Sequence, residues 1–279
     1  MSTGLATILL LGFAATAAAS TASTPFDLME DGSIVVPVTI GGTGSYRFVL
    51  DTGSSRTVIS TRLAKALHLP FIAKTVMVTP AGRDEAYIVR LEGLAVDGCA
   101  GLNVAAAVMP ADRYAAGQRV DGLIGQDVLS TLIYTIDYSQ RIVIWHAPGD
   151  IVAGDRLPLN VRNNRVLVSL AQHDADTNPV WLVPDSGSDA LVLFSHARNK
   201  LALKLLDVGV LSSLSGTRLA HRAELGNLVV GNARLNNPHA VVIDSDEPVE
   251  MMGDGLLPLN LFASVTFNVA AGYLIVQPR

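Results

Sequence analysis

Asp51-Thr52-Gly53-Ser54, at the end of the apolar run Phe48-Val49-Leu50, decides the fold because the chain repeats this pattern. The second copy is Asp185-Ser186-Gly187-Ser188, which follows Trp181-Leu182-Val183-Pro184. In each copy an apolar strand ends in an aspartate, and a hydroxyl residue, a glycine and a second hydroxyl residue follow. The pattern predicts a carboxylate on a tight turn, where the glycine allows a close approach of the backbone.

The two copies are in register with matched elements further along the chain. Asp51 and Asp185 are separated by 134 positions (185 − 51), and Gly82 and Gly216 by the same number (216 − 82). Asp121-Gly122-Leu123-Ile124 is echoed by Asp254-Gly255-Leu256-Leu257, and Thr135-Ile136-Asp137 by Thr266-Phe267-Asn268. The sequence therefore predicts two equivalent lobes related by a pseudo-twofold axis.

These turns, together with Leu123-Ile124-Gly125 downstream of the first, resemble those of the aspartic proteases. The resemblance covers roughly residues 34–276, and the balance between the lobes is more similar to a retropepsin dimer fused into one chain than to a long pepsin. It implies an all-β fold of two pseudo-twofold-related β-barrel lobes with short helices and an active-site cleft between them. A single Asp-Thr/Ser-Gly-Thr/Ser turn is a weak signal, whereas two in register are specific.

The resemblance names Asp51 and Asp185 as the catalytic residues. Two carboxylates brought together between lobes cannot both ionise cheaply, so they share one proton and titrate as a unit. One then acts as a base on a water held between them, while the other, protonated, donates a hydrogen bond to the scissile carbonyl oxygen. This chemistry needs neither a metal nor a cofactor.

Six residues are expected to support the dyad: Thr52, Gly53, Ser54, Ser186, Gly187 and Ser188. Thr52 and Ser186 match the positions at which family members make a hydrogen bond between the lobes. The hydroxyls of Ser54 and Ser188 are expected to bond to the carboxylate oxygens. Two features are unusual: Pro184 removes a backbone donor next to Asp185, and Asp189, if it points inward, would raise the affinity of the dyad for protons.

Two hairpins are predicted in the first lobe. Ile34–Ile40 and Tyr46–Leu50 flank a glycine-rich turn and deliver Asp51, and a short helix is predicted over Thr61–Leu69. Val76-Met77-Val78 and Tyr87-Ile88-Val89 flank a second turn at Pro80, Ala81 and Gly82. The resemblance implies that this hairpin is a flap over the substrate, with a counterpart at Ser215 and Gly216, although both are also compatible with ordinary surface hairpins.

The start of the chain is typical of a secretory signal peptide, with an apolar core from Leu5 to Ala15 and a small-residue exit at residues 17–19. We expect a signal peptide at residues 1–19, an exposed lead-in at 20–33, an N-terminal lobe at 34–146, a linker at 147–157 and a C-terminal lobe at 158–279. The lead-in is too short for an inhibitory prosegment, so no zymogen is expected. The protein is predicted to be secreted or periplasmic, and it is not expected to insert stably into a membrane once the signal peptide is removed.

Composition narrows the chemistry further. Apolar residues make up 49% of the chain and charged residues 16%, and a net charge of −5 argues against a nucleic-acid partner. Cys99 is the only cysteine, which rules out an intrachain disulfide. The six histidines include no pair at zinc-site spacing, and no nucleophile elbow or phosphate-binding loop occurs.

Three functions remain open at this point. The first is an exported aspartic endopeptidase, a monomer that acts on a peptide or unfolded protein. The second is a catalytically inactive peptide-binding protein of the same fold, disabled at Pro184. The third is an exported β-rich structural protein in which the turns are incidental. Two matched carboxylates favour the first, because a binding module does not need them.

Overall fold

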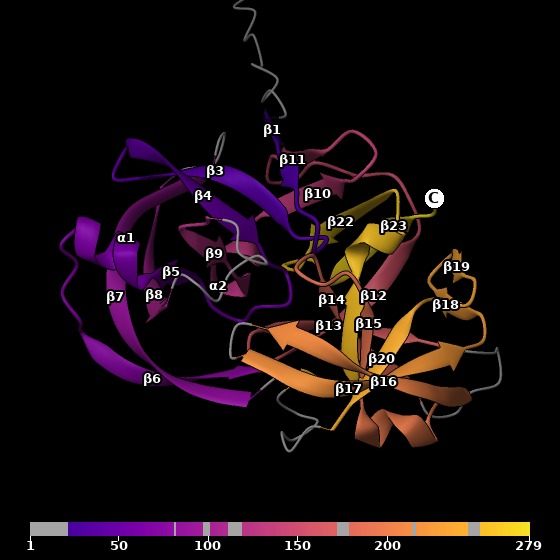
Figure 1. The fold of residues 1–279 in the computed structure, drawn as a ribbon. Helices are drawn as coiled ribbons and strands as arrows, with labels where there is room; N and C mark the ends of the chain where they lie inside the picture. Colours follow the sequence, from indigo (N-terminus) through magenta and orange to yellow (C-terminus); the bar gives the residue numbers. More distant parts are fainter. Residues whose placement is uncertain are drawn as a thin grey trace, which may run out of the picture.

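The computed structural model describes residues 22–80, 82–96, 101–110, 119–171, 179–213, 216–244 and 252–279. The predicted signal peptide and the hairpin-tip residues Ala81 and Ser215 lie outside these ranges. Two β-rich lobes lie side by side (Figure 1). In the described ranges the α-helices are short, α1 at Thr61–Ala66 and α2 at Gln126–Leu129, so the all-β, two-lobed prediction is confirmed.

The N-terminal lobe is an eight-stranded sheet in the order β2-β3-β4-β9-β5-β8-β7-β6. The predicted hairpin of β3 and β4 is present, and the last three residues of β4 run parallel to β9, which carries Leu123-Ile124 behind the first aspartate turn. The strands are β2 (Asp27–Leu28), β3 (Ile34–Ile40), β4 (Thr43–Leu50), β5 (Val58–Ser60), β6 (Ala73–Thr79), β7 (Gly82–Val96), β8 (Leu102–Met109) and β9 (Gly122–Ile124).

The C-terminal lobe repeats this connectivity. β14 runs parallel to β21 as β4 does to β9, and β15 runs parallel to β20 as β5 does to β8. The strands are β12 (Arg156–Arg162), β13 (Arg165–Leu170), β14 (Val180–Asp185), β15 (Leu191–Phe194), β16 (Leu203–Ser213), β17 (Gly216–Leu225), β18 (Leu228–Val230), β19 (Ala233–Leu235), β20 (Ala240–Ile243) and β21 (Gly255–Pro258). The 3-10 turns η3 (Ser195–Asn199) and η4 (Leu259–Leu261) take the places of α1 and α2.

A shared sheet joins the lobes. β10 (Ile133–Asp137) of the first lobe pairs antiparallel with β22 (Ser264–Asn268) of the second, with Thr135 opposite Thr266. The hydroxyls of these two residues are 2.7 Å apart, which marks where the pseudo-twofold axis crosses the sheet. β11 (Ile142–His146) and β23 (Tyr273–Gln277) extend the sheet on either side, so the lobes are hydrogen-bonded into one body.

Part of the expected lead-in is paired strand with buried side chains, and not exposed throughout. β1 (Ala22–Pro25) pairs with β11 and forms the edge of the shared sheet. Thr24 is fully buried and accepts a hydrogen bond from the Trp145 indole at 2.8 Å, and Phe26 packs edge-on against Tyr138. Pairing β1 with β11 satisfies hydrogen-bonding groups at the sheet edge, and burial of the Phe26 side chain is favourable. Both effects stabilise this segment against the first lobe. The predicted linker also ends early, since β12 already begins at Arg156.

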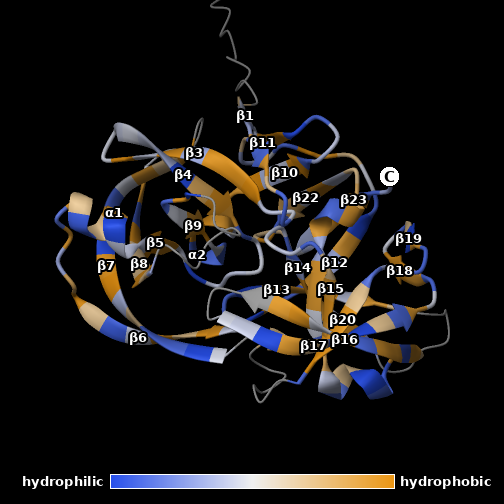
Figure 2. Cartoon of the chain, viewed as in Figure 1, coloured by the Kyte–Doolittle hydropathy of each residue, from blue (hydrophilic) through white to orange (hydrophobic). Residues whose placement is uncertain are grey.

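Apolar side chains fill both lobes and continue across the seam between them. Figure 2 shows the most hydrophobic stretches on strands in the interior, such as β3 and β15. At the seam the rings of Tyr134 and Phe267 stack at 4.9 Å between β10 and β22. In the described ranges no helix is both long and apolar enough to cross a membrane.

Candidate active site

The two aspartate turns lie face to face at the seam. β4 ends just before Asp51 and β14 ends at Asp185, and the glycine of each turn faces the carboxyl group of the other turn. A Cβ atom on Gly53 would lie 2.6 Å from Cγ of Asp185, and one on Gly187 would lie 3.4 Å from Cγ of Asp51. A side chain at position 53 would therefore collide with the opposite carboxylate, which explains the glycine.

A ring of four hydrogen bonds locks the turns together. The Thr52 amide donates to Oγ of Ser186 and the Ser186 amide donates to Oγ1 of Thr52, both at 3.0 Å. Each hydroxyl then donates across the seam to a carbonyl, Thr52 to Pro184 at 2.8 Å and Ser186 to Leu50 at 2.5 Å. Thr52 and Ser186 thus make the cross-lobe contact that the resemblance implied. Pro184 takes part through its carbonyl oxygen, which does not require the missing amide.

Backbone amides, rather than serine hydroxyls, hold the carboxylates. Oδ1 of Asp51 accepts from the amides of Gly53 and Ser54, both at 3.0 Å, and Oδ1 of Asp185 accepts from the amide of Gly187 at 2.7 Å. The expectation for the hydroxyls of Ser54 and Ser188 is wrong. Each donates to the carbonyl two residues further on at 2.8 Å, to Arg56 and Ala190 respectively. Such local bonds are what serine favours in a tight turn.

The environment favours one proton on the pair at neutral pH. Burial, followed by the charge of Asp51, raises the pKa of Asp185 to about 8, and Asp185 is only 8% exposed. Burial also raises the pKa of Asp51, but the amides of Ser54 and Gly53 and the charge of Arg165 oppose that rise. Asp189 is exposed and does not line the cavity above the dyad, so it does not act as the inward-pointing charge considered above.

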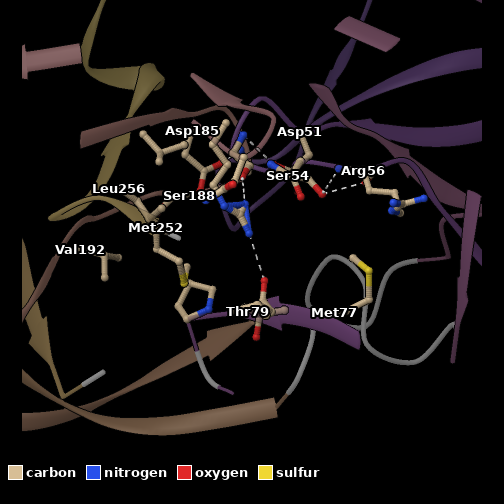
Figure 3. Close-up of a pocket in the computed structure, with 18 of the residues that line it drawn as sticks. Asp51, Ser54, Arg56, Met77, Thr79, Asp185, Ser188, Val192, Met252 and Leu256 are labelled. Atoms are coloured by element: carbon tan, nitrogen blue, oxygen red, sulfur yellow. Dashed lines mark hydrogen bonds between the residues drawn. The ribbon is translucent and has the colours of Figure 1, made fainter. Parts of the chain in front are cut away.

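A cavity of about 290 Å³ opens over the dyad. Figure 3 shows Asp51 and Asp185 on one side of it and Met77 and Thr79 of β6 on the other. The apolar lining on the side of the C-terminal lobe belongs to a buried group that we call the cleft cluster: Leu167, Val183, Val192, Phe194, Ala220, Ile243, Met252 and Leu256.

Both predicted flaps are hairpins that reach this cavity. β6 pairs with β7, with Thr79 opposite Gly82, and β16 pairs with β17, with Ser213 opposite Gly216. Gly82 and Gly216 adopt φ angles of 148° and 120°, which other residues rarely adopt, as tight tips require. Pro80 lines the cavity, whereas Gly82 and Gly216 do not.

The hairpin of β6 and β7 lies against the second lobe. Val78 packs against the cleft cluster, and so does Leu211 of the second hairpin. The Arg218 guanidinium lies 3.5 Å from the Pro80 carbonyl oxygen and links the two hairpins, whose ends approach each other in Figure 1.

Sequence reasoning missed two residues of the site. Arg165 lies in the cleft, where its guanidinium donates to the carbonyl oxygen of Gly53 at 3.4 Å and of Val78 at 3.2 Å. No sequence pattern distinguishes it from other arginines. Gln126 is buried and donates to the Thr52 carbonyl oxygen at 2.9 Å. A polar residue directly after the apolar Leu123-Ile124-Gly125 was a signal that could have identified Gln126.

Among the described residues, no three or more His, Cys, Asp or Glu side chains gather in a way that could hold a metal ion. Cys99 lies outside the described ranges.

The comparisons with known proteins agree with this geometry. A family model described as aspartyl protease matches residues 36–128 and again residues 170–261, which together make up more than half of the chain. Each match contains one aspartate turn and the strand that runs parallel behind it. None of the curated proteins compared with the chain matches it. The double match identifies the chain as a two-lobed, retropepsin-like member of the aspartyl protease family.

Proposed function

We propose that the protein is an exported aspartic endopeptidase that hydrolyses peptide bonds with a water activated by Asp51 and Asp185. The observation that carries the proposal is that both buried carboxyl groups line one cavity and that each faces the glycine of the opposite turn, beneath the hairpin of β6 and β7. Two carboxyl groups buried close together cannot both ionise cheaply, so sharing one proton lowers the free-energy cost of holding them there.

Differences in their surroundings support different protonation states for the two carboxyl groups. Asp51 accepts two amide hydrogen bonds and feels the charge of Arg165 more strongly than its partner does, which favours its ionised form. Asp185 accepts one amide hydrogen bond and has the more strongly raised pKa, which favours its protonated form. In the resting pair Asp51 is therefore the base and Asp185 the acid.

Hydrolysis then follows with balanced proton transfers. Asp51 takes a proton from the water as its oxygen bonds to the scissile carbonyl carbon, and Asp185 gives its proton to the carbonyl oxygen. In the resulting tetrahedral diol, Asp51 passes its proton to the amide nitrogen and the C–N bond breaks. Asp185 recovers a proton from the diol, so the products are a carboxylic acid and an amine, and the pair returns to its starting state.

The cavity suits an extended peptide. Its apolar wall of Val183, Val192, Met252 and Leu256 offers contacts to side chains, and β6 offers a strand edge at the outer limit of its sheet. The proposed substrate is therefore a peptide or unfolded protein bound by a monomer. Export is proposed from the apolar run at Leu5–Ala15 and the small residues that follow it.

A cleavage assay tests the proposal. The mature chain is incubated with unfolded casein from acidic to neutral pH, with and without pepstatin, alongside Asp51→Asn and Asp185→Asn. Asp189→Asn is the matched control, because this nearby carboxylate is exposed and does not line the cavity. We expect either dyad substitution to abolish cleavage and the control to retain it. Cleavage that survives both dyad substitutions would contradict the proposal.

The second candidate is a catalytically inactive peptide-binding protein of the same fold. Two observations favour it: Pro184 stands where the first lobe has Leu50, and the Arg165 guanidinium spans from the dyad turn to the flap across the cleft. Binding of casein peptides without cleavage by the unaltered protein would select this alternative.

A further inference from the structure

A second cavity lies on the N-terminal lobe, apart from the dyad. Its volume is about 630 Å³, and none of its lining residues lines the cavity above Asp51 and Asp185. Strand β4, helix α1 and the stretch just before β9 all contribute to it. We call it the arginine pocket, and it is lined by Ser45, Tyr46, Arg47, Arg62, Leu63, Ala66, Arg119 and Asp121.

Asp121 braces strand β4 against helix α1 in this pocket. Its Oδ2 accepts from the amide of Arg47 at 2.9 Å, and its Oδ1 accepts from the Arg62 guanidinium at 2.6 Å. The C-terminal lobe has the same brace: Asp254, 133 positions later (254 − 121), accepts from the amide of Trp181 at 2.8 Å. Trp181 in turn lies 134 positions after Arg47 (181 − 47). The acid is therefore structural in both lobes, and the lobes differ in what surrounds it.

In the C-terminal lobe the space around this acid is filled. Asp254 is fully buried, and the Lys200 ammonium group donates to both of its carboxylate oxygens, at 2.9 and 2.8 Å. His196, which is the counterpart of Arg62 (196 − 62 = 134), lies 3.3 Å from Oδ1 of Asp254. In the N-terminal lobe the side chains of Arg47 and Arg62 are instead 44% and 42% exposed, beside a cavity. Only the N-terminal lobe therefore combines this brace with an open, arginine-lined pocket among the residues that the structure describes.

Two of the three guanidinium groups already bind a carboxylate. Arg62 pairs with Asp121 at 2.6 Å, and Arg47 pairs with Asp27, just outside the pocket, at 2.8 Å. Arg119 is exposed and makes no hydrogen bond or ion pair with the part of the chain that the structure describes. Three arginines and two aspartates leave one positive charge (3 − 2) on a chain whose net charge is −5. The local potential therefore favours an anion here.

A carboxylate fits the pocket better than other anions do. One carboxylate neutralises the remaining charge, and its two oxygens match the planar fork of a guanidinium. The Tyr46 ring, Leu63 and Ala66 line the pocket beside the arginines and offer non-polar contacts to the rest of a ligand. A volume of about 630 Å³ also lies within the range of about 300–1,000 Å³ that is typical of sites for small organic ligands. The pocket therefore suits an organic carboxylate more than a bare inorganic ion.

We propose that the arginine pocket is a binding site for a carboxylate ligand, which Arg119 contacts directly. The carboxylate belongs either to an acidic side chain of a peptide or to a small organic acid. Because the pocket shares no lining residue with the cavity above the dyad, this site goes beyond the proposed peptidase function and does not depend on it.

Calorimetry with the same mature chain as in the cleavage assay tests the inference. The probes are the acetylated and amidated tetrapeptides Gly-Glu-Glu-Gly and Gly-Gln-Gln-Gly, glutarate and inorganic phosphate. We expect the Glu peptide, glutarate or both to bind at least about tenfold more tightly than the Gln peptide and phosphate. Binding of glutarate identifies a small acid as sufficient, whereas binding of the Glu peptide alone identifies a peptide. Failure of both carboxylate probes to bind, or phosphate that binds as tightly as they do, would overturn the inference.

Two variants assign the binding to the pocket. Arg119→Gln is expected to weaken binding of the carboxylate probe by about tenfold or more. Its thermal unfolding should match that of the unaltered protein, because the replaced side chain has no partner among the described residues. Arg234→Gln is the matched control: Arg234 is also exposed and without a partner in the described ranges, but it lies on β19 and lines neither cavity. Equal Kd values for Arg119→Gln and the control would overturn the inference.

A third variant separates the pocket from the cleft. Asp51→Asn changes the dyad, which lies in the other cavity, and is therefore expected to bind the carboxylate probe with the Kd of the unaltered protein. A Kd that changes in Asp51→Asn but not in Arg119→Gln would place the probe at the dyad and overturn the inference. Arg47 and Arg62 are kept in all variants, because each already holds a carboxylate of the fold.

Discussion

At the scale of single residues, the Thr52 side chain contributes two of the hydrogen bonds that join the aspartate turns. Its hydroxyl accepts from the Ser186 amide and donates to the Pro184 carbonyl oxygen, and all three groups are buried at the seam. Thr52→Val keeps the shape but leaves both partners without a hydrogen bond, so we expect the free energy of unfolding to fall by about 2–4 kcal/mol. Denaturant unfolding measures this fall, and Thr52→Ser, which keeps the hydroxyl, should lose much less. Equal losses in the two variants would contradict the role of the hydroxyl.

The dyad itself should destabilise the fold as pH rises. Burial and the charge of Asp51 raise the pKa of Asp185 in the folded state to about 8 from its ordinary value of 3.8, so the folded state holds a proton that the unfolded chain releases. Stability is then highest below about pH 4 and falls toward pH 8, because the unfolded state binds fewer protons. At pH 7, Asp185→Asn is expected to be more stable than the unaltered protein by about 2–4 kcal/mol.

Unfolding by urea at a series of pH values measures this difference. The advantage of Asp185→Asn should shrink as the pH falls to 4 and vanish well below it, where the carboxyl group is neutral in both states. Asp189→Asn, at an exposed neighbouring carboxylate, should run parallel to the unaltered protein at every pH. An advantage that does not depend on pH would mean that the proton on Asp185 is not its cause.

At the scale of elements, the second hairpin provides a test of whether it acts as a flap. Leu211 on β16 lines the cavity and packs against the cleft cluster, while the adjacent Val210 is 65% exposed. Because neighbours in a strand face opposite sides, Leu211→Ser should raise KM for peptides several-fold, whereas Val210→Ser should leave it unchanged. Steady-state kinetics with one peptide measure both KM values. Equal KM values for the two variants would show that the hairpin does not contact the substrate.

The elements that recur in the sequence were the predictable ones. The two aspartate turns, the strands behind them and both hairpins repeat at nearly constant spacing, so one copy supports the interpretation of the other. What occurs only once was not predictable. Arg165 depends on a turn that reaches the opposite lobe, and β1 depends on a partner strand more than a hundred residues away, which no local pattern reveals. The serine hydroxyls were misassigned because a position three residues after the aspartate does not determine the side-chain rotamer.

At the scale of the whole molecule, the features that the two lobes share differ in role from the features that only one lobe has. The symmetric parts build the seam: equivalent turns, equivalent parallel strands and the pair β10 and β22. The asymmetric parts distinguish the two carboxyl groups, since Asp51 receives two amides against one for Asp185. Gln126 is matched by the apolar Leu259 in the second lobe, so the backbone behind the two turns is also braced differently. A fused pair of lobes can evolve such differences, which identical subunits cannot.

The shared sheet should make the two lobes unfold together. Phe267 of β22 is fully buried and stacks on Tyr134 of β10 in the other lobe. Phe267→Ala removes this contact at the seam, with an expected loss of about 3–5 kcal/mol. Because β10 and β22 are hydrogen-bonded along their whole length, hydrogen exchange should speed up in β3 of the first lobe as well as in β20 of the second. Faster exchange confined to the second lobe would show that the seam transmits no stability, and that each lobe, with its own aspartate, folds independently.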